Sequence, residues 1–465
     1  MTTGVVVGSG PNGLAAAVVL ARAGLDVTVL EAADTIGGGA RSAELTVPGL
    51  VHDICSAIHP TGIASPFLRS LDLERHGLEW VLPAVQATHH VDPHRAGVMY
   101  DDLDRTAAAM GADADRWRRV FAPFVDHVDE VVEDVFGPLL HVPAHPVRFA
   151  RFGARAALPV QLATARWRTD EARGLMSGLA AHVIAPMTRP STTGIAMMFA
   201  TIGQSYGWPA AKGGSQAIVD ALVAELGSLG GRVETGHRVT ELPPADVVLL
   251  DTVPSAALDI VGDRAPAHVR AAFRRWRHGP GSFKLDLAVE GGIPWLHEES
   301  RRAGTVHLGG TIAEVHAGER AVVAGRMPER PFVLLAQQYL ADPGRSVGDV
   351  HPVWAYMHVP AGYAGDATQV ILDEIERHAP GTRDRVVAMR ASSPADLEAH
   401  NANYVGGDIT GGANTVLQTV FRPRPGLDPY KVADGVWLCS SSAPPGGGVH
   451  GMAGYHAATR AVRSL

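Results

Sequence analysis

The chain has 465 residues, of which 46% are hydrophobic and 19% are charged, and its formal net charge is −8. This length allows two or three domains or one large two-lobed enzyme, and the composition provides enough apolar surface for a core. An acidic chain lacks the global basic field of a nucleic-acid-binding protein. No uncharged apolar run approaches the ~18–20 residues that span a bilayer. We therefore expect a cytoplasmic protein, either soluble or peripherally attached to a membrane.

The two cysteines, Cys55 and Cys439, are far apart in sequence and form no CxxC pair. A dithiol redox relay is therefore not expected, and the low cysteine count is typical of a reducing compartment. The first apolar run already begins at Val5, so we also expect no signal peptide before it.

Residues 5–41 have the layout of a dinucleotide-binding βαβ unit. An apolar run leads into a glycine-rich turn, a helical pattern and a second apolar run that ends in an acid. The parts are Val5 to Val7, Gly8 to Gly13, Leu14 to Ala23 and Val27 to Glu31. This order favours a nucleotide site over an ordinary glycine-rich turn.

Each residue of the turn has a separate physical role. Gly8 makes the tight turn, Gly10 lets the backbone approach a pyrophosphate, and Gly13 lets the helix pack closely on the sheet. The free N–H groups and the dipole at the helix start hold phosphate charge, and Pro11 and Asn12 of the turn are also expected to contact the cofactor.

Glu31 is placed to accept a hydrogen bond from a ribose hydroxyl, which argues against a 2′-phosphate on the ligand. A second glycine cluster, residues 37–39, follows the acid and is not needed for NAD. It suits a longer ligand whose pyrophosphate is approached from two sides, with Arg41 close enough to neutralise it. This favours FAD. The residues expected to contact FAD here are Ala32, Gly38, Gly39, Ala40 and Arg41.

Two further segments, residues 212–242 and 435–460, repeat the combination of strands, helices and glycine turns. Together with residues 4–62 they resemble FAD-dependent oxidoreductases of the amine oxidase and phytoene desaturase superfamily, and phytoene-desaturase-related flavoproteins in particular. The resemblance implies an α/β fold, in which a discontinuous Rossmann-like FAD-binding domain of the glutathione reductase type carries an α+β substrate-binding domain.

In the middle segment, Gly213 and Gly214 precede a helical pattern, and a strand is expected through Val233 and Val239. The resemblance implies that the backbone near Val239 touches the adenine. Residues 245–250 are expected to form the next parallel strand of the same sheet.

In the C-terminal segment, an apolar strand at residues 436–438 is followed by serines, prolines and glycines, and a helix begins near His450. Such a turn exposes backbone donors, and a helix start stabilises negative charge on a ligand. The resemblance places the pyrophosphate at Ser440 and Ser441, where the family commonly has glycine. It places the flavin pyrimidine edge over Gly448, Val449 and His450.

The resemblance and the motifs divide the chain into alternating parts. FAD-binding parts are expected at residues 1–75, 208–262 and 418–465, and substrate-domain parts at residues 76–207 and 263–417. The first insertion is expected to be mainly helical. In the second, residues 283–289 alternate apolar and polar, which predicts a strand with one buried face.

Lys284, His59 and His450 are the candidate catalytic residues. In amine oxidases, which this stretch resembles, a lysine on such a strand holds a water against flavin N5. A lysine beside a buried flavin should have a depressed pKa and could accept a proton; the alternative is a surface lysine on the polar face of the strand. The two histidines are expected to converge on the isoalloxazine and handle protons near pH 7.

Three clustered histidines and two tyrosines have simpler interpretations. The HHxxxH spacing of His89, His90 and His94 matches no standard metal site, so we expect a loop and no metal. Tyr404 and Tyr455 are expected to pack or to line the pocket.

Residues 135–169 contain five arginines, several aromatic residues and no acid. Within them, residues 147–168 predict either contact with a membrane surface or substrate mouth, or a solvated helix face whose apolar residues pack inward.

Together these features predict an FAD-dependent oxidoreductase of a largely apolar small molecule, with non-covalent FAD. The expected reaction is a two-electron dehydrogenation, either a desaturation or an amine or C–H oxidation, with hydride transfer to flavin N5. No second NAD(P) fingerprint is present, so oxygen, a quinone or another carrier is expected to take the electrons. The alternatives are a redox-neutral flavin-dependent isomerase and a non-catalytic flavin- or lipid-binding assembly factor.

Overall fold

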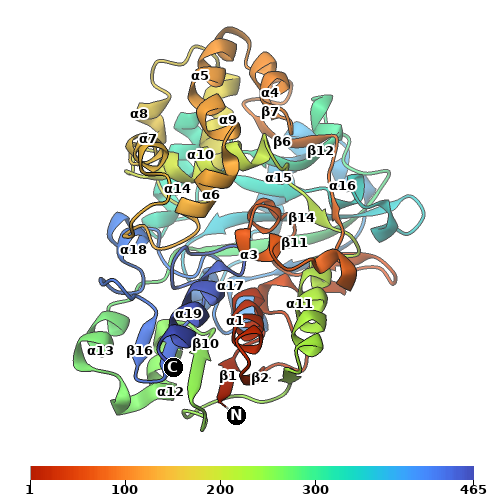
Figure 1. Ribbon diagram of the computed structural model, residues 1–465. Helices are drawn as coiled ribbons and strands as arrows, with labels where there is room; N and C mark the ends of the chain where they lie inside the picture. The colour runs from red at the N-terminus through yellow and green to blue at the C-terminus, as the bar shows by residue number, and fades with distance from the viewer. Residues whose placement is uncertain (1) are drawn as a thin grey trace.

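The computed structural model describes residues 2–465, which form two main sheets with helices on their faces (Figure 1). The first sheet has the strand order β16-β17-β10-β1-β2-β9, and the second has the order β15-β11-β14-β13-β12-β6-β7. The strands are β1 (Thr3–Val7), β2 (Asp26–Leu30), β3 (Ser42–Glu44), β4 (Val51–Asp53), β5 (Trp80–Val81), β6 (Val85–His90), β7 (Ala96–Met99), β8 (Ala210–Ala211), β9 (Arg232–Glu234), β10 (Val247–Leu250), β11 (Gly281–Glu290), β12 (Ala303–Leu308), β13 (Val333–Ala336), β14 (Val350–Val359), β15 (Val386–Ser392), β16 (Lys431–Ala433) and β17 (Val436–Leu438).

The helices lie between and over these strands. They are α1 (Pro11–Arg22), α2 (Pro60–Ile63), α3 (Pro66–Arg69), α4 (Leu103–Ala109), α5 (Ala114–Val125), α6 (Val128–Val135), α7 (Pro146–Ala156), α8 (Val160–Ala163), α9 (Asp170–Ala181), α10 (Thr192–Gly203), α11 (Gln216–Ser228), α12 (Pro254–Val261), α13 (Ala267–Arg274), α14 (Ile312–Val323), α15 (Thr368–His378), α16 (Thr382–Arg385), α17 (Pro394–His400), α18 (Val416–Phe421) and α19 (Met452–Arg463). Between residues 2 and 465, no helix combines the length and the apolar character needed to cross a bilayer.

The six-stranded sheet is assembled from the beginning, the middle and the end of the chain. Its neighbouring strands are parallel except for β16 and β17. This arrangement confirms the predicted α/β class and the discontinuous Rossmann-like domain. Strand β9 ends at Glu234, so the strand expected to continue through Val239 is shorter than predicted, and Val239 lies in the loop that follows.

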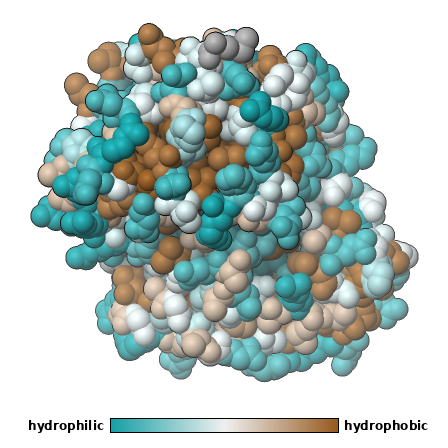
Figure 2. Space-filling view, turned by 90° about the horizontal axis from the view of Figure 1, so that it is seen from below, coloured by the Kyte–Doolittle hydropathy of each residue, from teal (hydrophilic) through white to brown (hydrophobic). Residues whose placement is uncertain are grey.

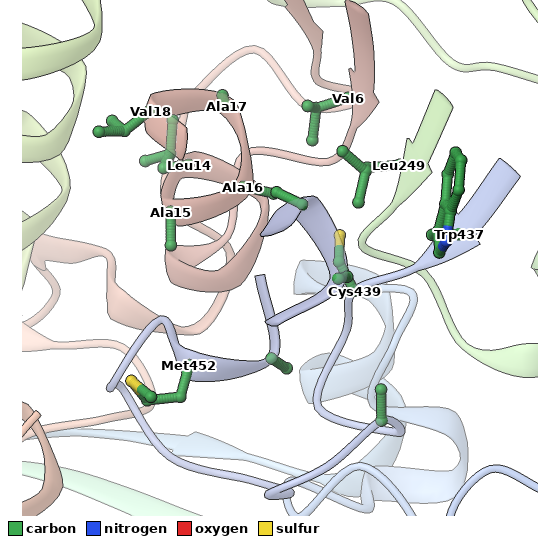
Figure 3. Packing of buried hydrophobic residues seen from close by; sticks show 14 of the residues in the cluster. Val6, Leu14, Ala15, Ala16, Ala17, Val18, Leu249, Trp437, Cys439 and Met452 are labelled. Carbon is green, nitrogen blue, oxygen red and sulfur yellow. The ribbon is translucent and has the colours of Figure 1, made fainter. Parts of the chain in front are cut away.

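Helix α1 packs closely on this sheet because its buried face is built of small residues. Ala15, Ala16 and Ala17 are fully buried, and Figure 3 shows them beside Val6 of β1 and residues of the C-terminal segment. Helix α19 approaches α1 at Gly454, where a Cβ atom would collide with the backbone carbonyl of Asn12. The C-terminal helix is thereby held against the start of α1.

The seven-stranded sheet unites the two insertions, since β6 and β7 come from the first and β11 to β15 from the second. Its neighbouring strands are antiparallel except for β6 and β12. Helix α15 packs on one face, while α9, α10 and α14 lie on the other side. The sheet is therefore covered on both faces.

This double covering changes the interpretation of β11. The alternation at residues 283–289 is present, but the expectation of one buried face is wrong because the strand is buried from Gly281 to Val289. Lys284 is only 2% exposed, so it is not a surface lysine.

The loop predicted at the HHxxxH sequence is wrong for its first two histidines. His89 and His90 end strand β6 and are fully buried, and only His94 lies in the exposed turn before β7. His89 Nε2 donates to the carbonyl of Gly310 over 2.8 Å, and His90 Nε2 lies 2.8 Å from Ser300 Oγ. Burial lowers the pKa of both histidines, so they are neutral members of the core, and His89 Nδ1 has no hydrogen-bond partner among residues 2–465.

The lower end of the molecule, where both termini lie in Figure 1, is seen directly in Figure 2. Hydrophobic residues gather in the upper part of that view and are surrounded by hydrophilic ones.

Candidate functional site

A cavity of 1080 Å³ connects the two sheets. At one end it is lined by the carboxyl ends of β1, β2 and β10, where the glycine turn and Glu31 lie. At the other end it reaches the face of the seven-stranded sheet and helices α7 and α10. Ligands of open α/β sheets bind outside the carboxyl ends of the strands, so the cavity has the position expected of a nucleotide site.

The glycine turn between β1 and α1 is shaped by close backbone approaches. Gly8 has φ +101, a conformation that favours glycine. A Cβ atom on Gly13 would collide with the carbonyl of Gly8, and one on Gly38 would lie 3.0 Å from the Cα of Gly10. The two glycine-rich segments therefore approach each other at the edge of the cavity.

Glu31 organises this edge through both carboxylate oxygens. Oε2 accepts from the Ser9 backbone N–H over 2.9 Å and from Ser9 Oγ over 2.6 Å, and Oε1 accepts from the Ala33 N–H over 2.9 Å. Arg41 Nη2 lies 3.6 Å from Oε1. The side chain is 8% exposed and lines the cavity. Glu31 thus holds the turn in place and also faces the cavity.

The end of α17 and the loop after it, residues 398–404, line the cavity beside the glycine segment 37–39. Arg41 Nη1 donates to the carbonyl of His400 over 3.2 Å. Asn403 bridges the end of β10, since its Nδ2 donates to the Asp251 carbonyl and its Oδ1 accepts from the Val253 N–H, each over 2.9 Å. Of these residues, only Tyr404 is singled out by the sequence, as a residue that packs or lines the pocket.

Asp251 is a second cavity residue that the motifs did not reveal. It follows β10, and its Oδ2 accepts from the Gly13 backbone N–H over 3.0 Å. Burial, together with the negative charge of Glu31, raises the pKa of Asp251 to about 7, although the Gly13 hydrogen bond opposes this shift. A carboxyl group at the phosphate end of the site is therefore partly protonated near neutral pH.

His450 faces the cavity from the C-terminal glycine turn. Its Nδ1 accepts from the Met452 backbone N–H over 3.0 Å at the start of α19. Burial lowers the pKa of His450 to about 4, so the ring is neutral near pH 7. The acceptor nitrogen is thus engaged by the helix it precedes.

The structure brings most of the predicted cofactor residues together at the cavity. Those that line it are Gly8, Gly10, Pro11, Asn12, Glu31, Ala32, Gly38, Gly39, Arg41, Val239, Ser441, Gly448, Val449 and His450. Gly13, Ala40 and Ser440 lie directly behind this wall. Cys55 and Tyr404 also line the cavity, whereas Tyr455 packs against Phe67.

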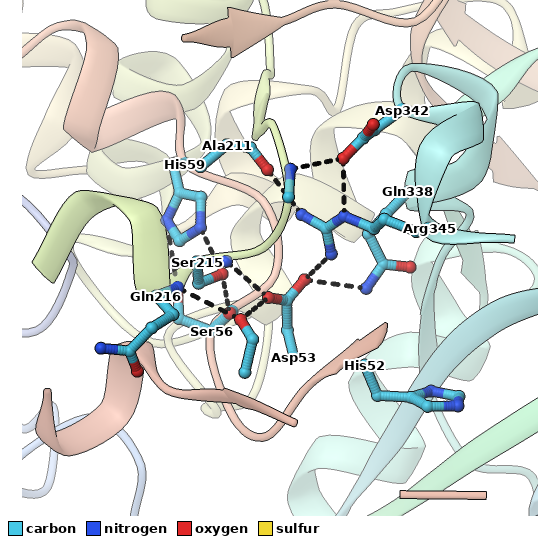
Figure 4. A network of polar contacts seen from close by, with 12 residues as sticks. His52, Asp53, Ser56, His59, Ala211, Ser215, Gln216, Gln338, Asp342 and Arg345 are labelled. Atoms are coloured by element: carbon cyan, nitrogen blue, oxygen red, sulfur yellow. Dashed lines mark hydrogen bonds and ion pairs between the residues drawn. The ribbon is translucent and has the colours of Figure 1, made fainter. Parts of the chain in front are cut away.

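His59 lies behind the wall, in the polar network of Figure 4. Its Nε2 is 2.8 Å from Ser215 Oγ, and burial lowers its pKa to about 4. In the same network Asp53 accepts from the Ser215 N–H and forms an ion pair with Arg345. The network fixes residues 55–58, which line the cavity, against α11 and the seven-stranded sheet.

Lys284 also lies one layer behind the cavity. Its Nζ is 2.5 Å from both oxygens of Asp286, two residues along β11. Burial lowers the pKa of Lys284, while the attraction of Asp286 opposes that shift. Neither Lys284 nor His59 reaches the cavity, so His450 alone of the three catalytic candidates lines it.

The far end of the cavity is largely apolar. Trp354 and Tyr356 of β14 and Leu334 of β13 contribute from the sheet, and α10 contributes Met198 and Phe199. A polar group is also present, since His182 lines this end and its Nε2 lies 3.3 Å from His307 Nε2. Such a lining is typical of a pocket for a small, mainly apolar molecule.

Comparisons with known proteins agree with this architecture. Residues 6–71 match a family model described as an NAD(P)-binding Rossmann-like domain. The structure of putrescine oxidase bound to putrescine superposes with a TM-score of 0.63 at 17% identity, over 100% of this chain and 98% of the other. Cyclohexylamine oxidase from Brevibacterium oxydans superposes with a TM-score of 0.60 at 15% identity, over 100% and 99%. The chain shares the fold of these oxidases.

The chain is also similar to a known protein over nearly its full length. That protein is the pyridine nucleotide-disulfide oxidoreductase domain-containing protein 2 of Rattus norvegicus, 24% identical over 554 residues, which cover 99% of this chain and 93% of the relative. The predicted resemblance to amine oxidases is confirmed at the level of the fold by the two oxidase structures.

The residues at the nucleotide end fit a dinucleotide. The two glycine segments leave room for a backbone approach that a side chain would fill. Asn12 Oδ1 is buried and has no hydrogen-bond partner among residues 2–465. This amide oxygen is an acceptor, so it calls for a donor such as a hydroxyl group of a ligand.

Proposed function

We propose that the protein is an FAD-dependent oxidoreductase that dehydrogenates a largely apolar small molecule. The observation that carries this proposal is the single cavity that joins the glycine turn to an aromatic and aliphatic pocket. A ligand bound at the glycine turn and a substrate in the pocket would share one enclosed space. The oxidases with the same fold support the reaction class.

The choice of FAD over NAD is part of this proposal. Residues 37–39 and Arg41 provide a second approach to a pyrophosphate beside the first glycine turn. The lining continues beyond the nucleotide end to Gly448, Val449 and His450 of the C-terminal turn. A cofactor that contacts both turns must extend beyond its adenine nucleotide, and in FAD the part beyond it is the flavin. When bound, FAD would supply the two-electron acceptor for the reaction.

The residues of the chain contribute binding, orientation and a dry environment. Glu31 and the start of α1 hold the nucleotide end, and Tyr356, Trp354 and Phe199 enclose the substrate end. Because His450 is neutral and its Nδ1 accepts a backbone N–H, it orients the turn. Oxygen, a quinone or another carrier would receive the electrons.

Purified protein and anaerobic mixing test this proposal. We expect yellow protein whose flavin absorbance bleaches when it is mixed with a substrate, in a panel of hydrophobic amines and other oxidisable apolar molecules. Conversion of a compound without net bleaching would support a redox-neutral isomerase instead. Protein that stays colourless after incubation with FAD would contradict the proposed cofactor and function.

We further propose that residues 147–168 contact an anionic membrane near the cavity. Val147 and Leu162 are 67% and 61% exposed, and Arg151 is exposed beside them. Phe152 packs inward and lines the cavity, so the segment connects the surface to the pocket. Exposed apolar and basic residues on short helices favour an anionic interface.

Co-sedimentation with vesicles of phosphatidylglycerol and of phosphatidylcholine tests this contact. We expect binding to the anionic vesicles only, and weaker binding of the variant Arg151→Glu. Arg148 is already paired with Glu130. We therefore expect Arg148→Glu to weaken vesicle binding less than Arg151→Glu does. Absence of binding to phosphatidylglycerol would remove the membrane contact.

A further inference from the structure

Arg422 is a buried cation that lines the cavity without a carboxylate partner. The residue follows α18 directly and is 4% exposed. No Asp or Glu among residues 2–465 forms an ion pair with it. Its guanidinium makes one long hydrogen bond, from Nη2 to Asn414 Oδ1 over 3.4 Å, and its Nε has no partner in this part of the chain.

No neighbouring carboxylate makes direct contact with this charge. Burial lowers the pKa of Arg422 to about 10, which still leaves the guanidinium protonated near neutral pH. Asp408 is the acid that acts on it, but the carboxylate of Asp408 already accepts from the Gly279 N–H and from the N–H and Oγ of Thr410, over 2.7, 2.9 and 2.7 Å. Buried charges in proteins are normally paired and hydrogen-bonded, so Arg422 feels the charge of Asp408 but lacks the directly bonded carboxylate expected for its position.

Packing fixes the orientation of the guanidinium. Its Cζ lies 5.9 Å from the ring centroid of Trp276. A Cβ atom on Gly446 would collide with Nη1, so the group lies against the backbone of the C-terminal glycine turn. Asn414, which accepts from Arg422, is itself held because its Nδ2 donates to the carbonyl of Val183 over 3.1 Å. The cation is thus pre-organised at the cavity wall.

The surrounding wall suits an amphipathic ligand. Helix α18 contributes Val416 and Val420 to the cavity immediately before Arg422, and Ile409 lines it from the preceding loop. A planar guanidinium binds carboxylates through paired N–H donors. One positive charge in an apolar wall matches one negative charge, as in a monocarboxylic acid.

We propose that Arg422 binds the carboxylate of the substrate, which makes the substrate class a hydrophobic monocarboxylic acid. That the bound acid is the substrate rests on the proposed function. The presence of an anion site at Arg422 does not depend on it. The carboxylate supplies the directly bonded counterion that Arg422 lacks, and its apolar body extends along the pocket toward Tyr356 and Phe199.

The test compares octanoate with octanamide as probes for the protein with its flavin bound. Binding is followed by changes in the visible flavin spectrum and by calorimetry. We expect the wild-type protein to bind octanoate more tightly than octanamide, and Arg422→Met to weaken octanoate binding by roughly 30-fold or more because a buried charge pair is lost. Octanamide binding should change less than about threefold.

Two variants serve as controls. Arg422→Lys keeps the charge, loses the planar fork and should recover part of the preference for octanoate, which also covers the case in which Arg422→Met does not fold. Arg189 lines the same cavity but is only half-buried, so Arg189→Met should weaken octanoate binding less than Arg422→Met because water partly screens its charge.

The results that would contradict the role of Arg422 differ from those that would contradict the proposed function. No preference of the wild-type protein for octanoate, or an unchanged preference in Arg422→Met, would overturn the assignment. So would a loss of FAD affinity in Arg422→Met with the preference retained, because the cation would then serve the cofactor. Colourless protein would refute the proposed function, while calorimetry with octanoate would still report on the anion site.

Discussion

The two sheets present their chemistry to the cavity in different ways. In the six-stranded sheet the central strands β1, β2 and β10 are mainly apolar and buried, and the functional groups come from the turns after them. In the seven-stranded sheet the functional groups are on the strands, on the face that α9, α10 and α14 cover. The first arrangement depends on local turns, and the second depends on strand register.

The register of the second sheet aligns its polar residues in rows. Residues paired across neighbouring strands share one face. One row contains Lys284, Tyr356, Leu334, His307 and His89. The next contains Asp286, Trp354, Ala336, Thr305 and Ala87. A slip of one residue in any strand would turn its contribution away from the cavity, so this end of the site is a property of the whole sheet.

The largest effect is expected from Gly13→Ala, which tests the dependence of the six-stranded sheet's site on its local turns. The new Cβ would collide with the Gly8 carbonyl, so the turn must open and we expect loss of bound FAD together with a lower melting temperature. FAD content after desalting and thermal unfolding measure both. Gly227→Ala in α11 is the matched control, since no atom lies within 4 Å of its Cβ and alanine favours a helix by up to about 1 kcal/mol. Retention of FAD by Gly13→Ala would contradict the close packing at this turn.

Lys284→Met tests the arrangement that depends on register. Removal of the lysine leaves Asp286 buried and unpaired, which costs about 3–5 kcal/mol of stability. The double variant Lys284→Met/Asp286→Leu removes both charges and should recover most of that loss, as measured by urea unfolding. If the single variant is as stable as the wild-type protein, the pair does not hold the sheet.

The same two variants test the catalytic role proposed for the lysine. If Lys284 acts on the flavin, its replacement should slow flavin turnover at least about tenfold, in the single variant and in the double variant. A structural lysine should leave turnover in the stable double variant close to that of the wild-type protein. The position of Lys284 behind the cavity wall favours the second outcome.

The contrast explains what the sequence could predict. The first βαβ unit, the helix after Gly214 and the strand before Ser440 depend on neighbouring residues, and they were predicted in place. Asp251, Asn403 and Arg422 have no local signal, because only long-range packing brings them to the cavity. The predicted role of Lys284 required its orientation relative to the cavity, which depends on the helices over the sheet.

Asp251 provides a pH-dependent test of the turn region. Its pKa is raised from 3.8 to about 7 in the folded protein, so its contribution to stability is complete below pH 3.8 and is lost as the pH rises through 7. At about 1.4 kcal/mol per pKa unit, this shift corresponds to at most roughly 4 kcal/mol.

We therefore expect Asp251→Asn to be more stable than the wild-type protein at pH 8, with the advantage shrinking as the pH falls toward 4. Urea unfolding of both proteins across this range measures the difference and cancels the other titrating groups. A difference in stability that does not vary with pH would show that Asp251 does not titrate as described.

The smallest effect is expected from Glu31→Ala, which compares two acids on neighbouring strands. Loss of a charge-assisted hydrogen bond to the ribose costs about 1.5–3 kcal/mol, so FAD affinity should fall roughly 10- to 100-fold. Glu234 of β9 is the matched control, because it pairs with Leu30 just before Glu31 but is exposed; Glu234→Ala should leave FAD affinity within about twofold. Equilibrium titration of the apoproteins with FAD gives both values. Equal affinities for the two variants would contradict a contribution of Glu31 to FAD binding.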